Sequence, residues 1–216
     1  MASPAFVQQK DNGALETTTV NITPTAGNML FVGASTYNGG ASTTASCADN
    51  RGNTYVALTP GLHTYNRFGF YAFNVKGAAT TITITYGVDS YAGIIVAEYS
   101  GVDTFDTQAG KDDGTEPSIT TGFANELVIT WISGDEESYQ FSGATFTPRV
   151  PSYTPIDNAI GDAIKATKGS ITPDWNEITL FTIGVAGFYA KAKASVADNS
   201  WLDRGVKTHT GLRGLR

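Results

Sequence analysis

The stretch Thr80-Thr81-Ile82-Thr83-Ile84-Thr85-Tyr86 decides the fold class, because its apolar and polar side chains alternate with a period of two. Successive side chains of a β-strand point to opposite faces of the sheet. Ile82, Ile84 and Tyr86 would therefore face a core, and the threonines between them would face solvent. The stretch predicts a half-buried strand with a solvated threonine face.

Similar stretches recur along the chain, separated by turns rich in Gly, Asn, Asp and Pro. The chain has 30 Thr and 24 Gly residues, which fit pleated surfaces and tight turns. We expect an all-β, antiparallel β-sandwich of jelly-roll type. The other expected strands are Leu15–Thr23, Met29–Ser35, Thr54–Leu58, Arg67–Phe73, Tyr91–Tyr99, Leu127–Ser133 and Ile178–Tyr189.

The stretch Ile156–Ile164 fits two structures. Its isoleucines recur every four residues, as on a helix face, but they also share one face of a strand with Asn158 and Asp162 between them. Gly161 and the surrounding strands favour a strand.

A faint internal repeat appears at an offset of 97, where Asn21–Leu30 aligns with Ser118–Leu127. It predicts a sandwich over residues 1–190, built from two halves at about 1–103 and 117–190 that together close it. The polar segment Asp103–Pro117 between the halves is expected to be a surface loop.

Charge divides the chain differently. Residues 1–189 carry eight basic and eighteen acidic residues, whereas residues 190–216 carry six basic and two acidic ones. We expect residues 191–216 to form a basic C-terminal arm that docks on a neighbour; a solvated tail is the alternative. The expected assembly contacts are Trp201, Leu202, Arg204, Arg213 and Arg216.

The order and spacing of several segments resemble those of a known family of domains. Gly27–Val32, Ala48–Tyr55, Phe70–Val75, Thr81–Thr85 and Glu98–Val102 together resemble a family of β-sandwich domains found in tailed-phage structural proteins and bacterial surface proteins. The resemblance spans roughly residues 5–190. It implies a minor tail or head decoration protein and supplies no catalytic residues.

No residue set predicts catalysis. Cys47 is the single cysteine and is expected to be a small buried apolar residue, and His63 has no nucleophile motif beside it. The carboxylates at Asp112, Asp113 and Glu116, and at Asp135–Glu137, lack the spacing of an EF-hand. We therefore expect no cofactor, with Ca²⁺ on one of these loops as the weaker alternative.

One carboxylate lies inside an apolar strand. Glu98 must face solvent or find a partner there, because burying it unpaired is costly, and the expected partner is an Arg or Lys such as Arg67.

Aromatic residues beside turns are the best signal for binding. Tyr37, Asn38, Tyr65 and Asn66 are the expected contacts of a glycan site. Aromatic residues also fill the cores of such folds, and Trp131 and Trp175 are expected there with their indole N–H groups satisfied.

These patterns lead to one functional expectation and two alternatives. We expect a non-enzymatic virion structural or accessory protein, made in the host cytoplasm without a secretion signal, that contacts other virion proteins and itself. The formal net charge of −6 argues against nucleic acid as a partner, and no apolar run is long enough to enter a membrane. The first alternative is a carbohydrate-binding module, and the second is a hydrolase, which would require a cleft with paired carboxylates.

Overall fold

The computed structural model describes residues 3–12, 18–37, 42–62, 65–88, 91–112, 115–134, 141–149, 157–175 and 182–190. These residues contain strands and no helix, so the all-β prediction is confirmed. The strands are β1 (Ala5–Asp11), β2 (Thr19–Ile22), β3 (Met29–Tyr37), β4 (Ala45–Asp49), β5 (Val56–Ala57), β6 (Tyr65–Ala72), β7 (Thr80–Tyr86), β8 (Tyr91–Ser100), β9 (Thr104–Lys111), β10 (Ile119–Thr121), β11 (Glu126–Gly134), β12 (Thr147–Pro148), β13 (Asp157–Lys165), β14 (Gly169–Ile171) and β15 (Thr182–Tyr189).

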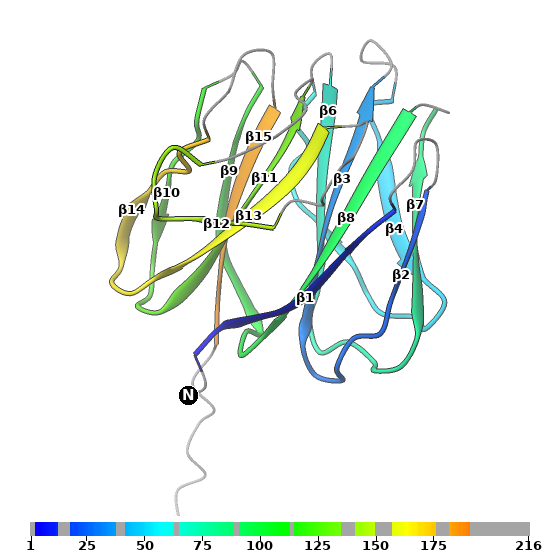
Figure 1. Ribbon diagram of the computed structural model, residues 1–216, viewed down its shortest axis with the longest axis horizontal. Helices are drawn as coiled ribbons and strands as arrows, with labels where there is room; N and C mark the ends of the chain where they lie inside the picture. The colour runs from blue at the N-terminus through cyan, green and yellow to red at the C-terminus, as the bar shows by residue number, and fades with distance from the viewer. Residues whose placement is uncertain are drawn as a thin grey trace, which may run out of the picture.

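The strands form four sheets that stack as layers (Figure 1). The first large sheet has the order β1-β8-β3-β6-β5, and the first small sheet has the order β2-β7-β4. The second large sheet has the order β12-β13-β11-β15-β9, and the second small sheet pairs β10 with β14. The two large sheets lie back to back in the middle, and each carries a small sheet on its outer face.

Apolar cores separate the layers, one in the centre and one on the outer side of each large sheet, where the second outer side has two neighbouring clusters. The central core, between the large sheets, contains Phe31, Tyr99, Trp131 and Phe188, all almost fully buried. One outer core lies between the first large and first small sheets, and the other between the second large and second small sheets. The layering therefore differs from the expected single sandwich, because each half covers a large sheet with a small sheet of its own.

The two halves repeat the same strand order. In the first large sheet the order begins β1-β8-β3-β6, and in the second the corresponding order is β9-β15-β11-β13. Even the edge irregularity recurs: β1 has a register shift between Phe6 and Gln8 opposite β8, and β9 has one opposite Gly187 and Phe188 of β15. Such bulges are specific local features, so their repetition ties the two halves to one plan.

The aromatic pairs beside these bulges also repeat. Phe6 packs edge to face on Tyr99 at 5.9 Å between ring centroids, and Phe105 packs the same way on Phe188 at 5.8 Å. We infer that the chain is a structural tandem repeat whose large sheets form an internal, nearly two-fold interface.

The repeat offset in the sequence is misleading inside the strands. At an offset of 97, Leu30 aligns with Leu127, but Leu30 faces the first outer core and Leu127 faces the central core. An offset of 98 pairs Met29 with Leu127, which both face the central core. A slip of one residue turns every side chain to the other face, so burial shows 98 to be the structural offset of β3 and β11.

Most expected strands are confirmed. β7 has the predicted bounds and alternation, with Ile82 and Ile84 buried, and the Ile156–Ile164 stretch is strand β13. The expected surface loop at Asp103–Pro117 is wrong over most of its length, because residues 104–111 form the edge strand β9. Its polar side chains fit an edge strand, which needs only partial burial.

Trp131 fills the central core because two strands lack side chains beside it. A Cβ atom on Gly69 would lie 2.7 Å from Cζ2 of Trp131, and one on Gly184 would lie 2.5 Å from the same atom. Trp131 is buried as expected, but its indole N–H has no partner among the described residues. Trp175 is buried as well, and its Nε1 donates to Thr130 Oγ1 at 3.1 Å.

The molecule has two distinct ends. Ala5 pairs with Ser100 and Thr104 pairs with Tyr189, so both ends of the described chain lie at one end, here called the terminal end (Figure 1). At the opposite end, Asn158 donates to the carbonyl oxygens of Gly33 and Gly93 across the central core. The two large sheets are therefore aligned along their length.

Candidate functional site

The expected glycan contacts Tyr37 and Tyr65 are cross-strand partners. Tyr37 of β3 pairs with Tyr65 of β6 on one side and with Tyr91 of β8 on the other. Three tyrosines from distant parts of the sequence thus form one row across the first large sheet, at the end opposite the terminal end. Asn66 is buried and its Nδ2 donates to the carbonyl oxygen of Ser42 at 2.6 Å, which turns the amide inward. Asn38 lies outside the described residues.

A buried polar layer follows directly below this row. Ser35 and Arg67 come from the first large sheet, and Ser133, Asn158 and Thr182 come from the second. The Oγ atoms of both serines and the Nε and Nη1 atoms of Arg67 have no hydrogen-bond partner among the described residues.

The Arg67 guanidinium carbon lies 4.8 Å from the Trp131 ring centroid. Burial lowers the pKa of Arg67 to about 10, against the opposing effect of Asp112. The guanidinium therefore stays charged at neutral pH and is stabilised in part by the aromatic face.

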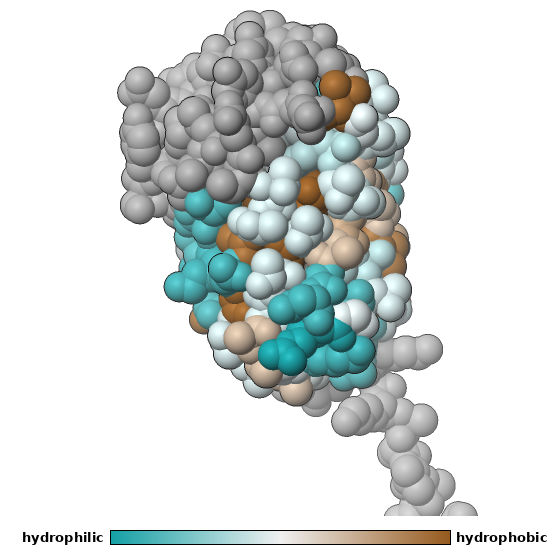
Figure 2. Space-filling model, turned by 90° about the vertical axis from the view of Figure 1, so that its right-hand side faces the viewer, coloured by the Kyte–Doolittle hydropathy of each residue, from teal (hydrophilic) through white to brown (hydrophobic). Residues whose placement is uncertain are grey.

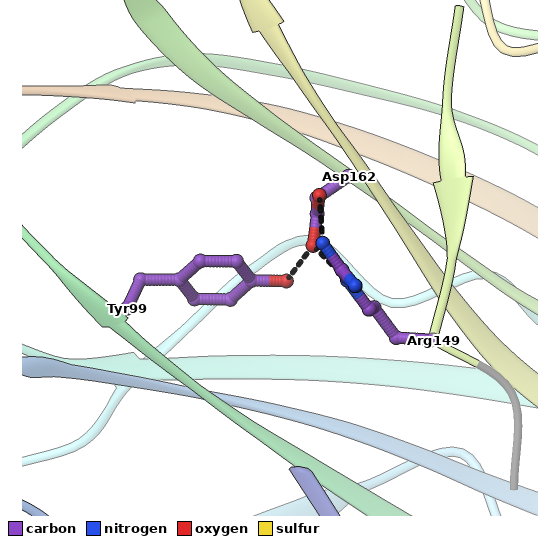
Figure 3. Close-up of polar contacts among 3 residues, drawn as sticks. All are labelled: Tyr99, Arg149 and Asp162. Atoms are coloured by element: carbon purple, nitrogen blue, oxygen red, sulfur yellow. Dashed lines mark hydrogen bonds and ion pairs between the residues drawn. The ribbon is translucent and has the colours of Figure 1, made fainter. Parts of the chain in front are cut away.

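Tyr99, Asp162 and Arg149 form a polar clamp between the large sheets (Figure 3). Tyr99 donates to Asp162 Oδ2 at 2.9 Å, and Arg149 donates from Nε to Oδ2 at 2.8 Å and from Nη2 to Oδ1 at 3.2 Å. Arg149 also stacks on Phe6, with its guanidinium carbon 3.8 Å from the ring centroid. Burial and the Asp162 carboxylate raise the pKa of Tyr99, so its hydroxyl remains a donor. All members are engaged with one another, and we assign the clamp a structural role.

Glu98 does not pair with Arg67, and that expectation is wrong. The Glu98 side chain is fully buried, with Oε1 accepting from Thr25 N at 2.8 Å and Asn28 Nδ2 at 2.6 Å, and Oε2 accepting from Gln8 Nε2 at 2.5 Å. It points to the outer face of β8, whereas Arg67 points into the central core. The alternation along each strand separates them, and neutral donors satisfy the carboxylate instead.

A polar groove of about 420 Å³ lies next to Glu98, between the edge strand β1 and the first small sheet. Strand β1 contributes Gln8 and Lys10, β2 contributes Asn21, and Thr23 follows directly after β2. The remaining lining residues are Ile22, Asn50, Arg51, Ala79, Thr80 and Thr81. Figure 2 shows the outer face of the first small sheet, where weakly polar residues cover the middle and strongly hydrophilic residues gather in the lower part.

Hydrogen bonds fix the far wall of this groove. Asn50 Oδ1 accepts from Thr81 N at 3.0 Å, and Asn21 Oδ1 accepts from Thr81 Oγ1 at 2.7 Å. Arg51 Nε donates to the Ala79 carbonyl oxygen at 2.8 Å. The Asp49 carboxylate accepts from the backbone nitrogens of Arg51 and Asn53, and its hydrogen bonds to Asn53 lower its pKa against the effect of burial. The turn that carries Asn50 and Arg51 is thus held by a charged acceptor.

A second carboxyl pair lies at the terminal end. Glu126 is fully buried and accepts a hydrogen bond from Phe123 N at 3.3 Å, while Asp106 on β9 accepts from Gly122 N at 2.8 Å. Burial, with the nearby Asp106 charge, raises the pKa of Glu126 to about 7. A protonated Glu126 can donate to Asp106, so this pair is a site of proton binding near neutral pH.

Sequence patterns did not identify these polar clusters. Asn158 and Asp162 were visible as polar residues on the inward face of an apolar strand, which is the usual signal of a buried polar pair. The groove left no such signal, because its walls come from four separate segments. The carboxylate groups at Asp112 and Glu116 form no cluster that could hold a metal ion, as judged over the described residues.

Cys47 lies half-buried beside the first outer core, where burial, and then the Asp49 charge, raise its thiol pKa. His63, Asp113, Asp135–Glu137 and the expected assembly contacts Trp201, Leu202, Arg204, Arg213 and Arg216 lie outside the described residues.

Comparisons with known proteins add no family. No protein-family model, curated protein or solved structure matches the chain. Within the described ranges, no helix is long and apolar enough to cross a membrane.

Proposed function

We propose that the protein is a non-enzymatic structural or accessory subunit of a virion, a head decoration or tail-associated protein that acts by assembly. The observation that carries the proposal is that both ends of the described chain lie at the same end of the molecule. Ser3 and Ala190 lie at the terminal end, so the basic residues 191–216 follow from the same end as the N-terminal strand. If the arm anchors the subunit to a neighbour at the terminal end, the loops at the opposite end remain free to face outward.

The rigid, layered body supports this role. Four sheets enclose apolar cores between them, and the polar clusters of the central core are used in holding the layers together. A body of this kind suits a subunit that must keep its shape when it is packed against neighbours. Homo-oligomers usually close by rotational symmetry, and a ring is the assembly we propose, with other virion proteins as partners.

The strand order also supports a jelly-roll topology for each half. In the first half, β1-β8-β3-β6 faces β2-β7-β4, which is the order produced by two interlocked Greek keys. We propose that both halves are jelly rolls fused back to back. This topology is common in capsid and lectin domains.

Light scattering on the full chain and on a chain ending at Ala190 tests the assembly proposal. We expect an oligomer for the full chain and a monomer for the truncated one, because the arm supplies Trp201, Leu202 and three arginines to a neighbour. A full-length variant with Arg204, Arg213 and Arg216 changed to Gln is the matched control for charge alone. Equal masses for all three proteins, together with full incorporation of the truncated chain into particles, would refute the proposal.

A carbohydrate-binding module is the second candidate, and the tyrosine row favours it. Tyr37, Tyr65 and Tyr91 lie side by side in register on three adjacent strands. Tyrosine is a residue type that can stack on the apolar faces of sugars. Tyr37→Ala and Tyr91→Ala should each abolish binding in a glycan screen if this candidate is correct, and a full chain that binds no glycan excludes it.

A further inference from the structure

The groove beside β1 combines a buried structural carboxylate with exposed polar and cationic lining residues. Its two walls belong to different sheets, and buried Glu98 ties them together: Gln8 on β1 binds one carboxylate oxygen, and Thr25 and Asn28, which follow β2, bind the other. Gln8 Nε2 also donates to the carbonyl oxygen of Thr23 at 2.8 Å. The groove is therefore held open at a fixed width by a buried, fully hydrogen-bonded anchor.

The second half of the molecule provides an internal control. By strand register, Gln8 corresponds to Thr107, Lys10 to Ala109 and Glu98 to Gly187. The second half keeps the same strands, bulge and aromatic pair without counterparts of Gln8 and Lys10, but Glu126 of β11 takes the place of Glu98. Its Oε1 lies against the Cβ position of Gly187, and it accepts a hydrogen bond from Phe123 N as Glu98 accepts one from Thr25 N. A buried carboxylate at this place is therefore a structural feature of both halves, whereas Gln8 and Lys10 are specific to the first half and need another explanation.

Positive charge gathers at this groove although the body is acidic. Lys10 and Arg51 are exposed lining residues, and no acidic residue is among the groove's lining residues. Lys76 adds a third cation nearby, with Nζ donating to the carbonyl oxygens of Arg51 at 2.9 Å and Gly52 at 3.1 Å. Of the eight basic residues in the first 189, three thus lie at one place. A cation-lined cleft concentrates anions at its mouth.

The uncharged lining residues suit a hydroxylated ligand. Asn21 and Asn50 use their amide oxygens within the protein, which leaves their amide nitrogens as the donors to a ligand. Thr80 and Thr81 line the floor beside them. None of the described lining residues is aromatic, so recognition by them rests on hydrogen bonds and charge, and the volume lies within the usual range for small-molecule sites.

We propose that this groove binds an acidic saccharide, a sugar unit carrying a carboxylate or phosphate group, with Lys10 and Arg51 pairing to the anionic group and the two asparagines binding hydroxyls. The proposal is independent of the assembly function, since it concerns a side face and needs neither the arm nor an oligomer. A subunit with such a site would attach its particle to an anionic glycan surface.

Calorimetric titration of the full chain tests the proposal with four probes: a tetrauronate, glycerol phosphate, inorganic phosphate and a neutral tetrasaccharide of the same length. We expect the tetrauronate or glycerol phosphate to bind, the neutral sugar not to bind, and the affinity to fall as salt is raised. Preference for one charged probe identifies a carboxylate or a phosphate as the natural group. Equal binding of the neutral sugar, or binding of inorganic phosphate alone, overturns the saccharide assignment.

Matched variants locate the site. Arg51→Gln and Lys10→Gln should each weaken binding about 10-fold or more, because a hydrogen bond between charged groups is lost. Lys168→Gln removes an exposed cation in the other half and should leave the affinity unchanged. An equal loss in Lys168→Gln, or no loss in either groove variant, contradicts the proposal. All three positions are exposed, so circular dichroism is expected to show the same fold in each variant.

Discussion

The hydroxyl of Tyr99 donates a 2.9 Å hydrogen bond to Oδ2 of Asp162, and this bond joins the two large sheets across the central core. Tyr99 comes from the first half of the chain and Asp162 from the second. The corresponding contact of the repeat is Phe188 on Tyr71, an edge-to-face ring pair at 5.2 Å. The same pair of repeat-related positions thus forms two contacts in the interface between the large sheets, one polar and one aromatic.

This relationship predicts the effect of Tyr99→Phe. The ring should still fit, because Phe188 occupies the equivalent position in the other half, but Asp162 loses one buried donor. We expect a loss of about 1–2 kcal/mol in the free energy of unfolding, measured by urea denaturation. In a double-mutant cycle with Asp162→Ala, which removes the acceptor, the double variant should lose less than the sum of the two single losses, because both single variants remove the same bond. Additive losses would show that the bond contributes nothing.

The glycines around Trp131 predict a steric effect. Gly69→Ala places a Cβ atom 2.7 Å from Trp131 Cζ2, and the ring cannot move away because Gly184 packs on its other side. We expect a destabilisation of about 1–3 kcal/mol by thermal or urea unfolding. Adding Trp131→Phe to Gly69→Ala should recover part of that loss, since the smaller ring makes room. A further loss in the double variant would contradict the packing argument.

We expect the raised pKa of Glu126 to make the free energy of unfolding depend on pH. Its pKa is raised to about 7 in the folded protein, so the folded state holds the proton more tightly than the unfolded state. The stabilisation is complete below about pH 4.5, the ordinary glutamate pKa, and is lost as the pH rises through 7. Glu126→Gln, which stays neutral, should therefore be more stable than the parent at pH 8, on the order of 1 kcal/mol. Near pH 5 the two should differ little. Parallel stability curves for the two proteins between pH 5 and 8 would rule out the raised pKa.

We expect the Cys47 thiol to react slowly with disulfide reagents in the folded protein. Burial and the neighbouring Asp49 raise the pKa of its thiol, so little reactive thiolate is present at neutral pH. A disulfide reagent should label folded protein much more slowly than urea-unfolded protein. As Cys47 is the single cysteine, the labelling rate reports the opening of the first outer core directly. Labelling of the folded chain at the rate of a free thiol would show that β4 does not protect it.

Sequence by itself determined the fold class and most of the strands. The alternation at Thr80–Tyr86 and the apolar run in β8 depend on local period and burial, which a strand pattern carries without knowledge of its partners. The same holds for the solvated threonine face of β7. The edge strand β9 was not predicted, because its side chains are half-exposed on both faces and its sequence pattern therefore resembles that of a polar loop.

Tertiary structure decided which residues meet. The pairing of Glu98 with Gln8 and Asn28, and its separation from Arg67, follow from the face of β8 on which it lies. Burial also decided whether the repeat offset between β3 and β11 is 97 or 98. The two sequences are similar at either offset, but a shift of one residue turns every side chain to the opposite face of the sheet. The groove exists only because strands from two sheets lie side by side. Local pattern fixes which residues are buried, and long-range packing fixes what they are buried against.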